Sequence, residues 1–82
     1  MKTEHQSELL RRINDGESVF RPENDTEDAM RKFQPLALEL IELQKQGLIE
    51  IGNPNIENKS GHRFINLIFN CRLTYNGMQS LD

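Results

Sequence analysis

Apolar residues near the start of the chain recur at helical spacing. They form one stripe, made of Leu9, Leu10 and Ile13. Thr3 and Gln6 have the spacing of a capping box, and Gly16 suits the left-handed position that follows a last helical turn. The pattern therefore predicts a first helix over residues 3–15, followed by a short strand over residues 17–21.

Pro35 determines how the next helical stretch is divided. Asp25 is expected to start a second helix, whose first turn holds the acidic residues that a helix dipole favours. An interior proline costs ~3 kcal/mol or more and disfavours helical angles at the residue before it, so a tight turn is predicted at Phe33 and Gln34. Proline is favoured at the first position of a helix, and a third helix is therefore predicted over residues 35–46. A single helix kinked at Pro35 is the alternative.

The predicted third helix is amphipathic. Its apolar arc consists of Phe33, Leu36, Ala37, Leu40, Ile41, Leu43 and Gly47. Gly47 is its expected terminator, and a strand is predicted directly afterwards, over residues 48–51. Residues 52–63 are rich in glycine, asparagine and proline, which predicts a polar loop.

From Phe64 onward the apolar pattern changes to a period of two, which predicts a strand. One face carries Ile65, Leu67, Phe69, Cys71 and Leu73. Phe64 and Ile68 lie on the opposite face, where they either pack beneath another part of the chain or form a partner surface. Thr74 is placed to cap a short helical turn over residues 75–81.

Composition and charge narrow the function classes. The chain has 82 residues and a net charge of −3, which suggests one small domain without a general affinity for phosphates. Only a local basic patch would support nucleic-acid binding. No apolar run is long enough to cross a bilayer and the charged N-terminus lacks an apolar signal core, so no membrane partner and a cytoplasmic location are expected.

The order of the predicted elements resembles that of winged helix-turn-helix domains. Two pieces of sequence carry the likeness. Leu43-Gln44-Lys45-Gln46-Gly47-Leu48-Ile49 is similar to the end of a recognition helix that runs into the first wing strand. Arg72-Leu73-Thr74-Tyr75-Asn76-Gly77 is similar to the leucine-threonine-x-x-glycine end of the second wing strand in bacterial regulators. The likeness implies a single α+β domain over residues 1–82, with three helices and a two- or three-stranded antiparallel sheet.

The same resemblance implies contacts with double-stranded DNA through a reading helix and a wing. The reading positions would be Gln34, Leu38, Glu39, Glu42 and Lys45. The wing and backbone contacts would be Lys59, His62, Arg63, Arg72, Arg31 and Lys32. In that geometry Glu39 and Glu42 would face a groove lined by phosphates, where their negative charges are electrostatically unfavourable. The simplest interpretation of these two residues is a solvated helix face. The wing cations are equally compatible with an ordinary solvated loop.

Catalytic and metal chemistry is not expected. Cys71 lies on the apolar face of the predicted strand, where an inert buried thiol is the expected state. His5 and His62 have no cysteine or second histidine at zinc-ligand spacing, and no catalytic or phosphate-binding motif is present. Neither an enzyme nor a cofactor is therefore predicted.

Two functions remain as hypotheses. The resemblance favours a DNA-binding protein, either a small transcriptional regulator or an accessory factor. The charge balance favours a module for protein–protein interaction on the same scaffold, either a homodimer or an adaptor, with Phe64 and Ile68 as the partner surface.

Overall fold

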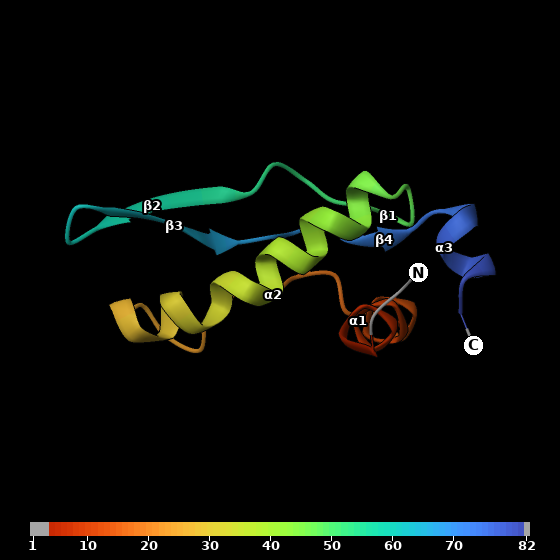
Figure 1. Ribbon diagram of the computed structural model, residues 1–82, viewed down its shortest axis with the longest axis horizontal. Coiled ribbons are helices and arrows are strands. Elements are labelled where there is room, and N and C mark those ends of the chain that lie inside the picture. Colours follow the sequence, from red (N-terminus) through yellow and green to blue (C-terminus); the bar gives the residue numbers. More distant parts are fainter. Residues whose placement is uncertain (1–3, 82) are drawn as a thin grey trace.

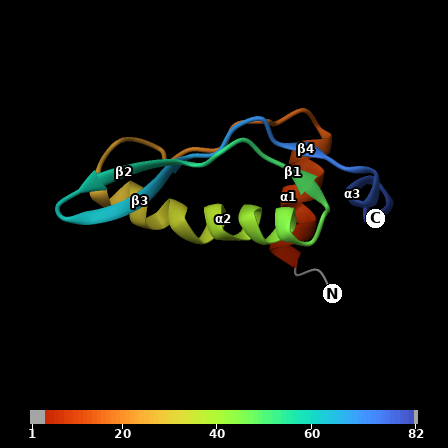
Figure 2. The same ribbon diagram turned by 90° about the horizontal axis from the view of Figure 1, so that it is seen from above.

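A long helix is the central element of the structure. The computed structural model describes residues 4–81, whose principal extents are 41 × 22 × 20 Å. The elements are α1 (Glu4–Asn14), α2 (Glu27–Lys45), β1 (Ile49–Glu50), β2 (Asn55–Lys59), β3 (His62–Leu67), β4 (Arg72–Leu73) and α3 (Tyr75–Gln79). The β2–β3 hairpin lies along the first half of α2, whereas α1 crosses the second half (Figures 1 and 2). The molecule thus has a hairpin end and an α1 end.

The first helix forms where its apolar stripe predicts. The three stripe residues, Leu9, Leu10 and Ile13, are all buried. Gly16 follows the helix with φ +108, the left-handed conformation that glycine adopts without a steric penalty. The predicted capping box depends on Thr3, which lies outside the described residues.

The second and third predicted helices are one continuous helix, α2, so the tight turn predicted at Phe33 and Gln34 is wrong. The physical reason is that the apolar residues of both segments lie on one face. Those buried in the core are Ala29, Met30, Phe33, Ala37, Leu40 and Leu43. Burying one such side chain contributes about 1.5–3 kcal/mol, so the whole stripe outweighs the proline penalty. Pro35 itself is exposed.

Both ends of α2 are capped by local side-chain and backbone geometry. The helix starts after Thr26, whose Oγ1 accepts a hydrogen bond from the amide of Ala29 at 3.2 Å. It ends at Lys45, Gly47 follows the C-cap residue with φ +78, and the amide of Leu48 donates to the carbonyl of Leu43 at 3.0 Å. The terminator predicted at Gly47 is confirmed, while the first helical residue, Glu27, lies two residues beyond the predicted Asp25.

The strands after α2 form one bent antiparallel ribbon. β1 pairs with β4, and β2 pairs with β3. Between these pairs the amide of Gly52 donates to the carbonyl of Phe69 at 2.8 Å. At the tip, Ser60 and Gly61 both have positive φ, as a two-residue type I′ turn requires. β2 lies inside the segment that was predicted to be a loop. The polar sequence of β2 does not predict a strand by itself, and the strand forms because it pairs with β3.

The strict alternation predicted after Phe64 does not hold. Phe64 is 5% exposed and Ile68 is fully buried, whereas Ile65 and Leu67 on the predicted core face are only half-buried. A register shift at Asn55/Ile56 and the positive φ of Asn70 change which side of the ribbon faces the core. Phe64 and Ile68 are therefore used within the chain, and the partner surface expected there is not exposed.

The short strand predicted over residues 17–21 is reduced to one bridge. The amide of Phe20 donates to the carbonyl of Ile68 at 2.8 Å, and the amide of Ile68 donates back at 2.9 Å. Over residues 4–81 the fold comprises three helices and two antiparallel strand pairs, so the predicted α+β class is confirmed. In the part of the chain described here, no helix is both long and apolar enough to span a membrane.

Candidate functional site

The five predicted reading positions do not act as one surface. The Gln34 amide donates to the Ile65 carbonyl at 2.8 Å and accepts from the Ile65 amide at 3.0 Å, which joins α2 to the outer edge of β3. Glu39 accepts a hydrogen bond of 2.9 Å from Gln6 on α1. The remaining three, Leu38, Glu42 and Lys45, are exposed on α2. Gln34 is thus committed to contacts within the chain, and Glu39 has one of its two carboxylate oxygens bonded to α1.

The hairpin end brings together several cations that are distant in sequence. Hydrogen bonds from Arg31 and Ser60 lower the pKa of Glu27, so the first turn of α2 is tied to the hairpin tip. The Arg31 guanidinium lies 5.4 Å from the ring centroid of Phe64, whose centroid is 6.1 Å from that of His62. Of the predicted contacts, Arg31, Lys32, Lys59, His62 and Arg63 share this end of the molecule. Arg72 lies apart from them, in β4.

Most of these cations are paired with carboxylates. The ion pairs are Arg31–Glu27 at 2.6 Å, Lys32–Asp28 at 3.3 Å, Lys59–Glu57 at 3.8 Å and Arg72–Glu50 at 2.5 Å. Arg63 makes no ion pair with any described residue. The hairpin end includes the cations Arg21, Arg31, Lys32, Lys59 and Arg63 and the acids Glu23, Asp25, Glu27, Asp28 and Glu57. Five charges of each sign cancel, so this end is not a basic patch.

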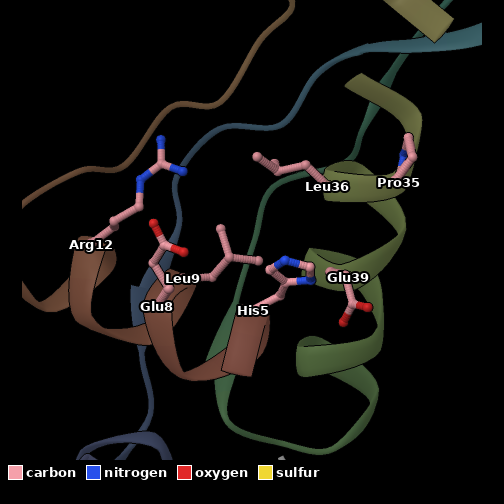
Figure 3. Close-up of a pocket in the computed structure, with 7 residues that line it drawn as sticks. All are labelled: His5, Glu8, Leu9, Arg12, Pro35, Leu36 and Glu39. Carbon is pink, nitrogen blue, oxygen red and sulfur yellow. The ribbon is translucent and has the colours of Figure 1, made fainter. Parts of the chain in front are cut away.

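A cleft separates α1 from α2 at the other end of the molecule (Figure 3). Its volume is about 240 Å³, and its lining residues are His5, Glu8, Leu9, Arg12, Pro35, Leu36 and Glu39. The α1 residues follow one another at intervals of three, one and three, which places them on a single helix face. The cleft thus exists because two amphipathic helices cross without filling the space between them. We call it the α1–α2 cleft.

The interior of the α1–α2 cleft is apolar. Leu9 is 4% exposed, and Leu36 is half-buried against the core. In Figure 3 the side chains of Leu9 and Leu36 extend toward the space between the two helices. Pro35 adds an exposed ring beside Leu36. A guest side chain placed here would exchange water for carbon contacts on both walls.

The charged groups around this interior differ in their availability. Arg12 donates to the two carboxylate oxygens of Glu17 at 3.1 and 2.5 Å, and its guanidinium lies 4.9 Å from the centroid of the Phe20 ring. The hydrogen bonds to Glu17 raise the pKa of Arg12. Glu8 is exposed and makes no hydrogen bond or ion pair within residues 4–81, and Glu39 keeps one oxygen free of its bond to Gln6. The rim therefore offers two carboxylates, whereas its arginine is already engaged.

No group of three or more potential ligands is close enough to hold a metal ion within the part of the chain that the structure describes. Cys71 is buried, and desolvation raises the pKa of its thiol to about 11, which keeps the thiol protonated and unreactive. The α1–α2 cleft was not predicted from the sequence, because it depends on the crossing of two helices. The signal available in advance was the mixed polar and apolar face of residues 5–12.

Comparisons of the chain with protein-family models, with curated proteins and with solved structures found no match. The winged-helix resemblance therefore remains a prediction, and the function is argued below from the geometry of the chain itself.

Proposed function

We propose that the chain is a protein-interaction module whose α1–α2 cleft receives a side chain of a partner protein. The observation that carries this proposal is an apolar cleft of about 240 Å³ between Leu9 and Leu36. Pockets for drug-sized molecules usually measure about 300–1,000 Å³, so this volume suits a single anchoring side chain better. Anchors of this kind provide most of the affinity in many protein interfaces.

The charge distribution supports this proposal over DNA binding. The net charge is −3, and the cations of the hairpin end are balanced by an equal number of acids. Gln34, one of the five predicted reading positions, bonds to β3 instead of facing outward, and Glu39, another, lines the α1–α2 cleft with a negative charge. Because a fold does not determine its function, these side chains weigh more than the family resemblance.

Selection of peptides from a random phage-displayed library tests the proposal. A selected peptide is then titrated into the ¹⁵N-labelled protein, and the shifted backbone amides are assigned. We expect shifts concentrated at residues 5–12 of α1 and 36–39 of α2. The variant Leu36→Ser should weaken binding, whereas Leu38→Ser, which alters an exposed leucine outside the cleft, should not.

Two results would overturn the proposal. One is a selection that enriches no peptide, and the other is a peptide whose shifts map away from the α1–α2 cleft. Mapping on the unmodified protein keeps the test valid even where Leu36→Ser lowers stability.

DNA binding is the second candidate function. Arg63 favours it, because this arginine lies beside the hairpin tip without an ion pair in the described chain. Fluorescence anisotropy with random duplex DNA should then show binding that weakens steeply with salt. Arg63→Ala should reduce that binding, and Arg11→Ala is the matched control, since Arg11 is also exposed and without an ion pair in the described chain but lies on α1, away from the hairpin. Absence of binding at low salt would exclude this function.

A further inference from the structure

We infer that the partner segment carries an apolar anchor side chain directly beside a lysine or arginine. This inference rests on the proposed function and adds the chemistry of the occupant. It follows from the contrast between the apolar walls of the α1–α2 cleft and the carboxylates on its rim.

The apolar part of the occupant is set by the walls. Leu9 forms a floor that is almost inaccessible to water, and Leu36 with the Pro35 ring forms the opposite side. A polar anchor would lose its hydration here without gaining hydrogen bonds from these three residues. A phenylalanine, leucine or methionine side chain instead gains free energy in proportion to the apolar surface that it removes from water.

The charge of the peptide residue beside the anchor is determined by the charged side chains of the cleft rim that can still form an ion pair. The Arg12 guanidinium bonds to both oxygens of Glu17 and covers the Phe20 ring, so an incoming anion would have to compete with Glu17. Glu8 makes no hydrogen bond or ion pair with the described residues and feels only the coulombic attraction of Arg12, and Glu39 is held by the neutral amide of Gln6. A cation beside the anchor is therefore attracted by Glu8 and Glu39, whereas an anion is repelled by them.

The positions of the two carboxylates favour a peptide segment as the occupant. Glu8 belongs to α1 and Glu39 to α2, and in Figure 3 Leu9 and the His5 imidazole lie between their carboxylates. An extended segment that inserts one side chain between the helices places its neighbouring residues toward the two rims. One short peptide segment can therefore supply both the anchor and the basic residues that approach Glu8 or Glu39.

Three capped pentapeptides test the inference. The first is glycine–phenylalanine–arginine–lysine–glycine, the second replaces both cations with glutamate, and the third replaces phenylalanine with alanine. Each is titrated into the ¹⁵N-labelled protein, and the shifts of residues 5–12 and 36–39 are followed. We expect the first peptide to bind at least about fivefold more tightly than the second, as one or two partly exposed charge pairs allow. The alanine peptide should not shift these amides measurably.

Neutral variants separate charge from shape. The double change Glu8→Gln and Glu39→Gln keeps the size of both side chains and leaves Gln6 an acceptor at position 39, so the fold should persist. It should remove the preference for the basic peptide. Glu42→Gln is the matched control, because Glu42 is an exposed glutamate of α2 outside the cleft.

The outcomes distinguish this inference from the proposed function. Equal or tighter binding of the acidic peptide at the cleft would overturn the inference while supporting an interaction site there. Library-selected peptides that bind the cleft but lack a basic residue beside the anchor would do the same. If neither the library nor the pentapeptides shift the cleft amides, both proposals fail.

Discussion

Gly77 in α3 packs directly against the backbone carbonyl of Leu48. A Cβ at position 77 would overlap that carbonyl oxygen, far inside the closest approach of two non-bonded heavy atoms. Gly77→Ala should therefore lower the free energy of unfolding by about 1–3 kcal/mol, the usual cost of overpacking. Urea unfolding followed by circular dichroism measures this change. Asn76→Ala, at an exposed position of the same helix, should have a much smaller effect.

This contact also explains the two pieces of sequence that resemble winged-helix domains. Thr74 donates from its amide to the Leu48 carbonyl at 3.1 Å, and from its hydroxyl to the Gly47 carbonyl at 2.6 Å. Its Oγ1 accepts from the amide of Gly77 at 3.0 Å, which caps α3. The two pieces are thus in contact, and their residues stabilise the junction between α2, β4 and α3. If Gly77→Ala were neutral, this structural explanation would be wrong.

Gln34 joins α2 to β3 through both atoms of its side-chain amide. Gln34→Ala removes a donor and an acceptor from the Ile65 backbone and leaves two partly buried polar groups without partners. We expect the free energy of unfolding to fall by about 1–3 kcal/mol. Amide hydrogen exchange should also become faster along β3, a local effect that Leu38→Ala, at an exposed position one turn later, should not produce.

Pro35 lies in the interior of α2 and has no N–H to donate to the carbonyl of Arg31. Pro35→Ala restores that donor and removes the clash of the ring, although it also gives the unfolded chain more freedom. We expect a net gain of about 2 kcal/mol in the free energy of unfolding. A loss of stability would instead indicate a turn before Pro35, with the proline at the first position of a new helix.

The sequence predicted the features that depend on local chemistry. The stripe of α1, the glycines that end α1 and α2, and the threonine cap of α3 each follow from residues within one or two turns. The continuity of α2 was only the alternative prediction, because it depends on burying both halves of its apolar face against β1 and β3. β2 was missed for a similar reason, since its ladder is supplied by a strand that follows it in the chain.

The candidate site depended even more on tertiary structure. The spacing placed Gln34 and Glu39 on the face expected to read DNA, but nothing local revealed that β3 and Gln6 would bond to them. The pairing of Arg31 with Glu27 follows a helical i,i+4 pattern and was open to prediction. The pairing of Arg72 with Glu50 depends instead on the register of β1 with β4.

The pKa of Glu27 makes the attachment of the hairpin tip dependent on pH. Hydrogen bonds from Arg31 and Ser60 lower this pKa in the folded state. The stabilisation is therefore fully present above the unfolded pKa of about 4.3 and is lost as the pH falls through the lower folded pKa. Glu27→Gln should flatten the fall in melting temperature across this acidic range. Glu42→Gln is the control, and an equally flattened profile in that variant would show that the effect is not specific to Glu27.

Cys71 should resist thiol reagents while the chain is folded. The side chain is 5% exposed, and desolvation raises the pKa of the thiol to about 11, so both access and thiolate formation are suppressed near neutral pH. A chromogenic disulfide should label the folded protein far more slowly than the urea-unfolded protein.

The unfolded thiol ionises near its ordinary pKa of about 8.5, so the free energy of unfolding should decline as the pH rises from there toward the folded pKa. Cys71→Ala should remove this part of the alkaline decline, and rapid labelling of the folded protein would contradict the burial of Cys71.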